Sequence, residues 1–211
     1  MNPDIPKQFL PLNGLPVLMH SVNVFRRFDP AIQIVITLPR DYFSFWDTLC
    51  LKYNFQLKLE RTPGGKTRVH SVKNALTLVK DAEYIAIHDG VRPLVSEETI
   101  RKAFEEAALF GNAVPVIPVS ESVRKTKANL TIPVPRNTLY IVQTPQVFRT
   151  GLIQKAYSAI DNDDFTDDAT VLETIGEKIH LFEGNRENIK ITYPDDLIIA
   201  EALLRDLAKK E

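Results

Sequence analysis

Short apolar segments alternate with longer segments of helical periodicity along most of this chain, and this alternation restricts the possible folds more than any other feature. The segments 32–38 (IQIVITL), 84–87 (YIAI) and 113–119 (AVPVIPV) have the length and the β-branched content of buried strands. Segments 17–28 and 97–111 place apolar residues at helical spacing instead. Strands that alternate with helices predict an α/β domain of Rossmann-like architecture, with a mostly parallel sheet and helices on both faces.

The pattern changes between residues 120 and 140. This segment, SESVRKTKANLTIPVPRNTLY, is polar, partly alternating and interrupted by prolines, which predicts a β-arm that protrudes from the domain. Pro115 and Pro118 predict an edge or irregular position for the strand before the arm. Because the chain has no internal repeat or low-complexity segment, we expect one domain over residues 1–211, with the arm at about 120–140.

Composition and charge exclude several classes of protein. Hydrophobic residues make up 44% of the chain and charged residues 25%, which is typical of a globular domain and not of a disordered one. A net charge of -1 gives no general affinity for nucleic acid or for an anionic membrane. Cys50 is the only cysteine, so an intramolecular disulfide and a multi-cysteine zinc site are excluded. Without a long apolar run or a signal-peptide core, the chain is expected to be cytoplasmic.

Charged residues follow the strand at 84–87 directly, in the stretch AIHDGVRPL. Asp89 and Arg92 therefore lie at the carboxyl end of a predicted central strand, which is where open α/β sheets bind ligands. Pro93 prevents the strand from continuing. The alternative interpretation is that Asp89 and Arg92 form a pair that only braces its own turn.

A glycine pair precedes a predicted helix in the stretch TPGGKTRVHSV. Gly64 and Gly65 allow the backbone to approach a ligand closely, and Lys66 and Arg68 add cationic donors. The spacing differs from that of a P-loop. A simple turn between strand and helix is the alternative interpretation.

Further along the chain, FTDDATVLE predicts a helix that begins with Thr166 as its capping residue. NIKITY predicts a strand that places Lys190 and Thr192 on one face. The polar run Gln143-Thr144-Pro145-Gln146 after an apolar segment suits recognition of a base or a sugar, or local backbone contacts. Cations from separate segments that surround one strand-end carboxylate suit a polyphosphate with a divalent ion, and predict phosphoryl or nucleotidyl transfer; these cations are Lys7, Lys66, Arg68, Arg92, Arg136 and Lys190.

Six segments, in order, carry a resemblance to a known family: PKQFLPLNGLPVL, PGGKTRVHSV, HDGVRPLV, RNTLYIVQTPQVF, TDDATVLE and NIKITYPDDL. Together they resemble the 2-C-methyl-D-erythritol 4-phosphate cytidylyltransferases of non-mevalonate isoprenoid precursor synthesis, from about Asp4 to the C-terminus. The resemblance implies a homodimer formed through the arm, magnesium or another divalent cation, and CTP and a polyol phosphate as substrates. A substrate phosphate would attack the α-phosphorus of CTP, and pyrophosphate would leave.

The resemblance also implies roles for individual positions. Lys7 would stabilise charge at the α-phosphate, Asp89 would hold substrate and metal, and Lys190 would act in catalysis and in nucleotide binding. Gly64, Gly65 and Ser71 would read the nucleotide. The residues that would hold the polyol phosphate are Asp89, Arg92, Ser122, Arg136, Thr144, Thr166 and Thr192, with Arg136 supplied by the neighbouring subunit. Ser122 stands where the family usually has threonine, so the hydroxyl is kept.

The N-terminus departs from the family pattern. The family begins with a strand and a glycine-rich loop ahead of PKQ, and both are missing before Pro6 in this sequence. We expect the natural start to lie upstream of Met1. Two alternatives to the methylerythritol phosphate enzyme follow from the residues: a ribitol 5-phosphate cytidylyltransferase with similar motifs, and a truncated, non-catalytic nucleotide-binding module.

Overall fold

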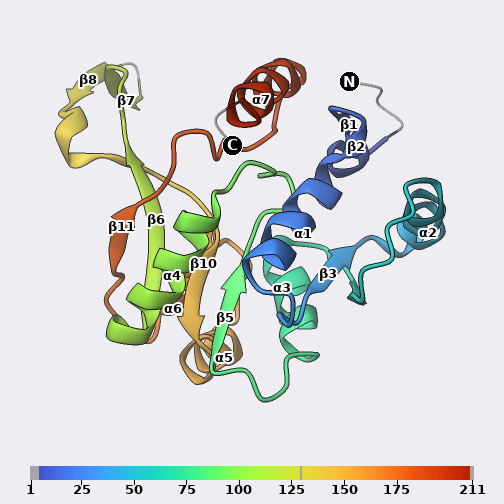
Figure 1. Ribbon diagram of the computed structural model, residues 1–211. Helices are drawn as coiled ribbons and strands as arrows, with labels where there is room; N and C mark the ends of the chain where they lie inside the picture. The colour runs from blue at the N-terminus through green and yellow to red at the C-terminus, as the bar shows by residue number, and fades with distance from the viewer. Residues whose placement is uncertain (1–4, 129, 210–211) are drawn as a thin grey trace.

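The computed structural model describes residues 5–128 and 130–209, and a mixed sheet forms its centre. Within these residues the largest sheet has the order β11 (Leu181–Glu183), β6 (Asn112–Pro118), β10 (Gln146–Arg149) and β5 (Tyr84–Ile87), and β9 (Tyr140–Val142) also pairs with β6 (Figure 1). β11 runs parallel to β6, whereas β10 is antiparallel to β5 and β6, and β9 is antiparallel to β6. The prediction of a mostly parallel sheet is therefore wrong. The chain returns from the arm straight into β9 and β10, without the helical crossover that a parallel strand requires.

Helices cover both faces of this sheet, as predicted. Val147 and Phe148 are neighbours on β10, so their side chains point to opposite faces. Val147 belongs to a core cluster with Ala103 and Ala107 of α4 (Glu97–Phe110). Phe148 packs with residues of α3 (Arg68–Leu76), α5 (Thr150–Ala159) and α6 (Asp168–Glu173).

The predicted helix at 97–111 shows why local signals suffice for some elements. The Ser96 hydroxyl accepts a hydrogen bond from the Thr99 amide at 3.0 Å, which caps the first turn. Gly111 ends the helix with φ +83°, a conformation that glycine adopts without a Cβ penalty. α1 (Val17–Phe28) matches its predicted range and packs against α4.

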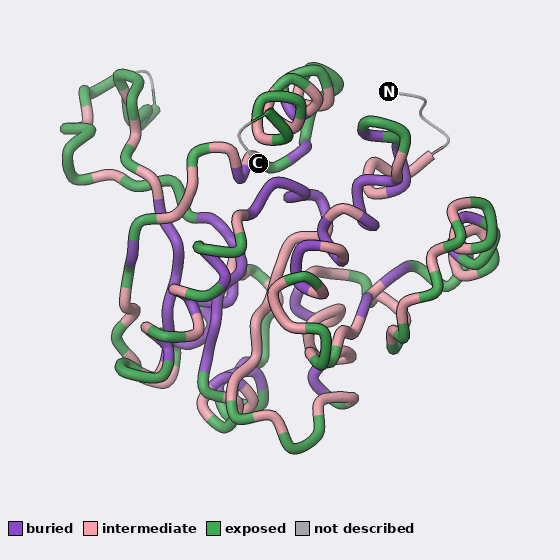
Figure 2. Tube along the Cα trace, in the orientation of Figure 1, coloured by how far each residue is buried: buried purple, intermediate pink, exposed green. Residues whose placement is uncertain are grey.

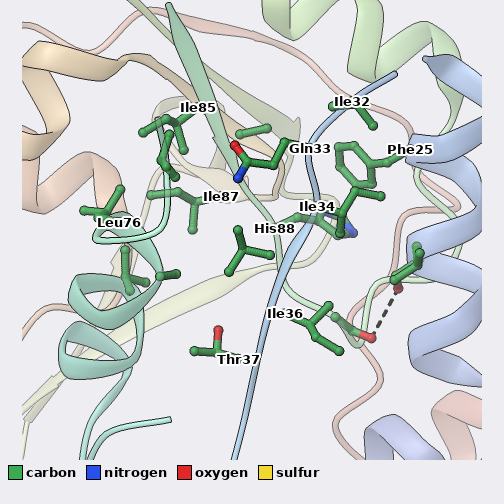
Figure 3. Close-up of a pocket in the computed structure, with 18 of the residues that line it drawn as sticks. Phe25, Ile32, Gln33, Ile34, Ile36, Thr37, Leu76, Ile85, Ile87 and His88 are labelled. Carbon is green, nitrogen blue, oxygen red and sulfur yellow. Dashed lines mark hydrogen bonds between the residues drawn. The ribbon is translucent and has the colours of Figure 1, made fainter. Parts of the chain in front are cut away.

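A second, smaller sheet lies apart from the first. β3 (Val35–Leu38) and β4 (Glu60–Pro63) pair in parallel, and α2 (Phe43–Lys52) packs its Trp46 against β3. No ladder joins β3 to β5 among the described residues. A cavity of about 410 Å³, which we call the slot, lies between them and is lined mainly by apolar side chains of segments 32–37 and 84–87 (Figure 3). All four residues of β5 are consequently only half-buried, although their sequence predicts a buried strand (Figure 2).

The arm is a two-stranded hairpin, as predicted. β7 (Val123–Lys127) and β8 (Leu130–Val134) form an antiparallel pair that projects from the body (Figure 1). Leu130 and Ile132 are 75% and 55% exposed on it. The arm thus presents apolar side chains to solvent in this protomer.

Two strand assignments from the sequence need correction. β6 is an interior strand and not an edge strand, although Pro115 does lie at an irregular point, between the ladder to β10, which includes Ala113, and the ladder to β9, which begins at Val116. The carbonyl of Pro115 accepts from the Gln143 amide there at 2.8 Å, and no ladder donor is lost. Residues 188–193 form no strand, although Ile191 is fully buried and its amide donates to the Val91 carbonyl at 2.9 Å.

The remaining elements are short or terminal. They are η1 (Lys7–Phe9), β1 (Pro11–Leu12), β2 (Leu15–Pro16), η2 (Arg40–Tyr42), η3 (Arg136–Thr138) and α7 (Pro194–Leu207). Met1, on which the expectation about the N-terminus depends, is outside the described residues. Within 5–128 and 130–209, no helix has the length and apolar character needed to cross a membrane.

Candidate active site

The carboxylate of Asp89 lies just beyond the end of β5, between two cations. Its Oδ2 atom is 3.0 Å from Lys190 Nζ and accepts a hydrogen bond from Arg92 Nε at 3.2 Å. Burial favours the neutral form of Asp89, but Lys190, Arg92 and Arg68 outweigh this effect and hold the pKa of the carboxyl below its usual value. The carboxylate is thus charged at neutral pH.

Arg92 braces the turn that follows β5. It is buried, and besides Asp89 it contacts the carbonyl oxygens of Asn188 at 2.9 Å and Val142 at 3.3 Å. The Arg92 amide also donates to the Asp89 carbonyl at 2.9 Å and closes the turn. Arg92 therefore braces the turn while its positive charge stays next to the carboxylate.

His88 and Thr144 fix the backbone of Asp89. The Asp89 amide donates to Thr144 Oγ1 at 3.0 Å, and Thr144 Oγ1 lies 3.0 Å from His88 Nδ1. His88 Nε2 is 3.1 Å from the Arg92 carbonyl, which can only accept, so Nε2 carries the proton and the Thr144 hydroxyl donates to Nδ1. Burial, the largest cause, lowers the pKa of His88 to about 4 and keeps the ring neutral.

The glycine pair is held against the start of α3. Ser71 Oγ accepts from the Gly65 amide at 3.0 Å and donates to the Thr67 carbonyl at 3.0 Å. A Cβ on Gly65 would lie 2.1 Å from the His70 Cβ, so only glycine fits there. At Gly64 a Cβ would meet nothing closer than 3.5 Å. The loop therefore keeps its shape through one glycine and one hydroxyl.

Two buried polar residues tie the QTPQ segment to its surroundings. Gln146 Oε1 accepts from the amides of Asp168 at 3.1 Å and Ala169 at 2.8 Å, which fixes the start of α6. Asn188 Nδ2 donates to the Thr144 carbonyl at 2.8 Å. The Gln146 side chain thus binds backbone groups, but of a segment distant along the chain and not of its own turn.

The start of α6 differs from the prediction. Asp167, not Thr166, is the capping residue, and its Oδ1 accepts from the Thr170 amide at 2.9 Å. The carboxylate is a better acceptor for the helix amides than the hydroxyl. Thr166 precedes the cap, is exposed and borders a cavity of about 250 Å³.

That cavity brings together part of the predicted site. Its lining includes Asp89, Arg92, Thr144, Thr166 and Lys190, together with Arg68, Val142, Gln143, Gln146 and Asp167. Ser71 borders the slot, which Asp89 and Arg68 also line. The predicted residues that line neither cavity are Lys7, Gly64, Gly65, Lys66, Ser122, Arg136 and Thr192.

The sequence predicts that Lys190 and Thr192 share one face of a strand, but no strand forms here and the two side chains are separated. Lys190 reaches Asp89 from an irregular segment, whereas the Thr192 amide donates to Asp196 Oδ2 at 2.7 Å at the start of α7. Arg136 lies in η3 at the base of the arm and donates to the Ser120 carbonyl. Arg136 thus borders neither cavity of its own protomer.

Asp89 and Asp167 are the carboxylates that line the cavity of about 250 Å³, and Asp167 already caps α6. Within the described part of the chain, no group of three or more His, Cys, Asp or Glu side chains could hold a metal ion. Lys190 and Arg92 both contact Oδ2 of Asp89. Oδ1 is therefore available, which fits Mg²⁺, because this ion commonly binds one or two carboxylates together with substrate phosphates and water.

Sequence reasoning missed the supporting residues of the site. His88, Gln146, Asn188 and Asp168 are buried polar residues whose partners lie far along the chain. The signal available for them was a polar residue beside an apolar run. Such a signal indicates burial but does not identify the partner.

Comparison with known proteins gives a consistent result over nearly the whole chain. The family model described as 2-C-methyl-D-erythritol 4-phosphate cytidylyltransferase matches residues 1–206. The chain is 48% identical over 204 residues to the protein of that name from Bacteroides fragilis, covering 97% of this chain and 93% of the relative. It is 46% identical over 206 residues to that from Porphyromonas gingivalis, covering 97% and 91%. The crystal structure of the enzyme of this name from Thermus thermophilus aligns with a TM-score of 0.78 and 30% identity, over 95% of this chain and 94% of that one.

Proposed function

The chain belongs to the 2-C-methyl-D-erythritol 4-phosphate cytidylyltransferase family, and from this premise we propose that it joins CTP and 2-C-methyl-D-erythritol 4-phosphate, in the cytoplasm, in non-mevalonate isoprenoid precursor synthesis. The observation that carries the proposal is the charged Asp89 between Lys190 and Arg92, at a strand end that borders the same cavity as Ser71. Such a cluster suits a reaction in which anionic groups must be held together and neutralised.

In this reaction an oxygen of the polyol phosphate attacks the α-phosphorus of CTP. The bond from that phosphorus to the oxygen that bridges the α- and β-phosphates breaks, and pyrophosphate leaves with the bond electrons. The chain supplies charge and position and needs no nucleophile of its own. Lys190 and Lys7 offset negative charge at the α-phosphate, the loop of Gly64, Gly65 and Ser71 binds the nucleotide, and Thr166 offers its hydroxyl to the polyol phosphate.

Mg²⁺ would be held by Asp89, through the oxygen that Lys190 and Arg92 leave open. When bound, the ion supplies charge neutralisation between the phosphates of CTP. Asp89 itself remains charged at neutral pH, because its three cationic neighbours hold its pKa low. The other assigned contacts of Asp89, Arg92, Ser122, Thr144 and Thr192 with the polyol phosphate belong to the same proposal.

The arm is the proposed dimer contact. Its exposed Leu130 and Ile132, and the exposed Tyr140 and Ile141 of β9, offer apolar area to a second copy. Arg136 stands in this region, outside the cavity lining of its own protomer, and would complete the site of the partner.

The slot supports the expectation that a strand precedes Pro6. It lies between strands β3 and β5, each of which is paired on one side only within the described residues, and most of the side chains that line it are apolar. We assign it to the first strand of the domain, followed by a glycine-rich loop at the phosphates. The mass of the protein expressed from its natural gene tests this assignment, and 23.9 kDa would contradict it.

The test of the function is pyrophosphate release from CTP and Mg²⁺, with methylerythritol phosphate and ribitol 5-phosphate offered separately. We expect release only with methylerythritol phosphate, and most strongly from the form that carries the upstream strand. Release with ribitol 5-phosphate alone would identify the protein as a ribitol 5-phosphate cytidylyltransferase. If neither form, with or without the upstream strand, releases pyrophosphate with either substrate, the result would favour the non-catalytic nucleotide-binding module.

A further inference from the structure

Three buried or half-buried side chains form a cluster between the two cavities. Asp168, the first residue of α6, is fully buried, and its Oδ1 accepts from Arg68 Nη1 at 2.8 Å. Its Oδ2 accepts from Arg68 Nη2, so the pair is bidentate. The Tyr157 hydroxyl of α5 donates to Asp168 Oδ1 at 2.6 Å. The carboxylate therefore holds Arg68 by two bonds and is itself held by a third.

The surroundings leave the carboxylate little freedom. Tyr157 is 2% exposed, and burial and the neighbouring Asp168 raise the pKa of its hydroxyl above the usual value, so the hydroxyl keeps its proton and donates. Gln146 fixes the backbone of Asp168 from the other side through its amide. The orientation of the Arg68 guanidinium is thus set by three helices and by β10.

Arg68 retains donors beyond those that bind Asp168. A guanidinium has five N–H groups, and the bidentate contact uses two of them, one on each terminal nitrogen. The Arg68 side chain is 30% exposed and lines both the slot and the cavity of Asp89 and Lys190. An arginine that only braced two helices would not need to border both cavities.

We propose that Asp168 and Tyr157 form a rigid mount that presents Arg68 to a phosphate group bound between the glycine loop and Asp89. The assignment rests on the proposed function and adds Arg68 as a substrate-contacting residue, with Asp168 and Tyr157 as positioning residues. Arg68 begins the helix that follows Gly64 and Gly65, so the phosphate belongs to the nucleotide. A fixed fork gives a directional contact, which a flexible ammonium cannot reproduce.

The decisive variant is Arg68→Lys, because it keeps the charge and loses the fork. We expect it to raise the dissociation constant for CTP and Mg²⁺, measured by calorimetry, by about tenfold or more, as for one lost charge-assisted hydrogen bond. Tyr157→Phe leaves the bidentate pair in place and should give a smaller rise. The matched control is Arg61→Lys, which alters a surface pair with Asp47, lines neither cavity and should change nothing.

A triple variant separates binding from stability. Replacing the cluster with apolar residues, in Arg68→Met, Asp168→Leu and Tyr157→Phe, removes every partner together and so leaves no unpaired buried charge. We expect a folded protein that has lost the affinity for CTP. If this variant or Arg68→Lys binds CTP as tightly as the wild type, the cluster is a structural brace and the proposal is overturned.

The binding and kinetic measurements also show whether the phosphate belongs to CTP or to the polyol phosphate. A rise in the Michaelis constant for the polyol phosphate, with the affinity for CTP unchanged, would also overturn the assignment of Arg68 to the nucleotide. If the wild type releases no pyrophosphate, the proposed function fails, and binding of inorganic pyrophosphate by wild type and Arg68→Lys still decides the role of Arg68. Equal affinity of the two, or no binding by either, would overturn it.

Discussion

Replacing Asp89 with asparagine should destabilise the protein by an amount that the contacts allow us to estimate. Arg92 is 8% exposed and loses one charge-assisted hydrogen bond, which costs about 1.5–3 kcal/mol. The Lys190 side chain is 44% exposed, so solvent replaces most of what it loses, and its share is about 0–1 kcal/mol. Because the asparagine oxygen can still accept one bond, the sum is reduced, and we expect a loss of roughly 1–3 kcal/mol in the free energy of unfolding at pH 7.

The pH dependence of this loss has a definite sign. The folded pKa of Asp89 is lower than the unfolded value, so its contribution is fully present above pH 4 or so and is lost as the pH falls through the folded pKa. The difference between wild type and Asp89→Asn should therefore be largest near neutral pH and shrink in acid. Turnover at pH 7 should fall by about 10²–10³-fold, the range for one lost electrostatic group in an active site.

Urea unfolding of both proteins at several pH values measures the stability, and pyrophosphate release measures the turnover. Asp47→Asn is the matched control, because Asp47 pairs with Arg61 at the surface, where the side chain is 57% exposed, and the expected loss is about 0–1 kcal/mol. Equal losses in the two variants, or a difference that does not change with pH, would refute the electrostatic account of Asp89. If turnover by Asp89→Asn is unchanged, the turn of Asp89 and Arg92 has a purely structural role.

Three further outcomes are expected. Gly65→Ala should lower the free energy of unfolding by about 1–3 kcal/mol in urea titrations, because its Cβ would lie 2.1 Å from that of His70, whereas Gly64→Ala should cost little; equal effects would refute the steric reasoning. Stability should fall as the pH drops from about 6.5 towards 4, because the unfolded chain binds a proton that buried His88, with its pKa of about 4, does not; an NMR titration of His88 near pH 6.5 would contradict this. Ile132→Asp on the arm should convert a dimer into monomers in sedimentation experiments without weakening the domain body, and a monomeric wild type would exclude the arm as the dimer contact.

Elements with complete local signals were predictable from the sequence. Helix α4 carries its own capping serine and its own terminating glycine, and the structure confirms both. The same holds for the hairpin of the arm, whose turns and alternating strands lie within one short segment. The family follows from motifs in six segments, and the comparisons confirm it.

Features that depend on distant partners were not predictable in this way. The segment around Ile191 alternates like a strand, yet the buried side chain is satisfied by packing and one backbone bond, without a ladder. The direction of β10 depends on where the arm returns, which no local pattern records. The pair of Arg68 and Asp168 joins residues 100 positions apart, and neither residue type indicates the other.

The break between β3 and β5 has a consequence for how the molecule opens. Phe9, Met19, Leu38 and Trp46 belong to a core cluster on the β3 side that is separate from the cluster of Phe148 on the β5 side. Among the described residues no backbone ladder crosses the break, and the two halves are joined by packing, where α1 contacts α4 and where α3 contacts β3, β4 and α5. Side-chain contact alone couples two regions less tightly than a shared ladder, so β3, β4 and α2 form a separate cooperative unit with its own, lower opening free energy. As long as no strand occupies the slot, amide protons of β3 should therefore exchange with solvent well before those of β10, and folding should follow two coupled transitions. A strand in the slot would join β3 to β5 by backbone ladders and should remove this difference in exchange.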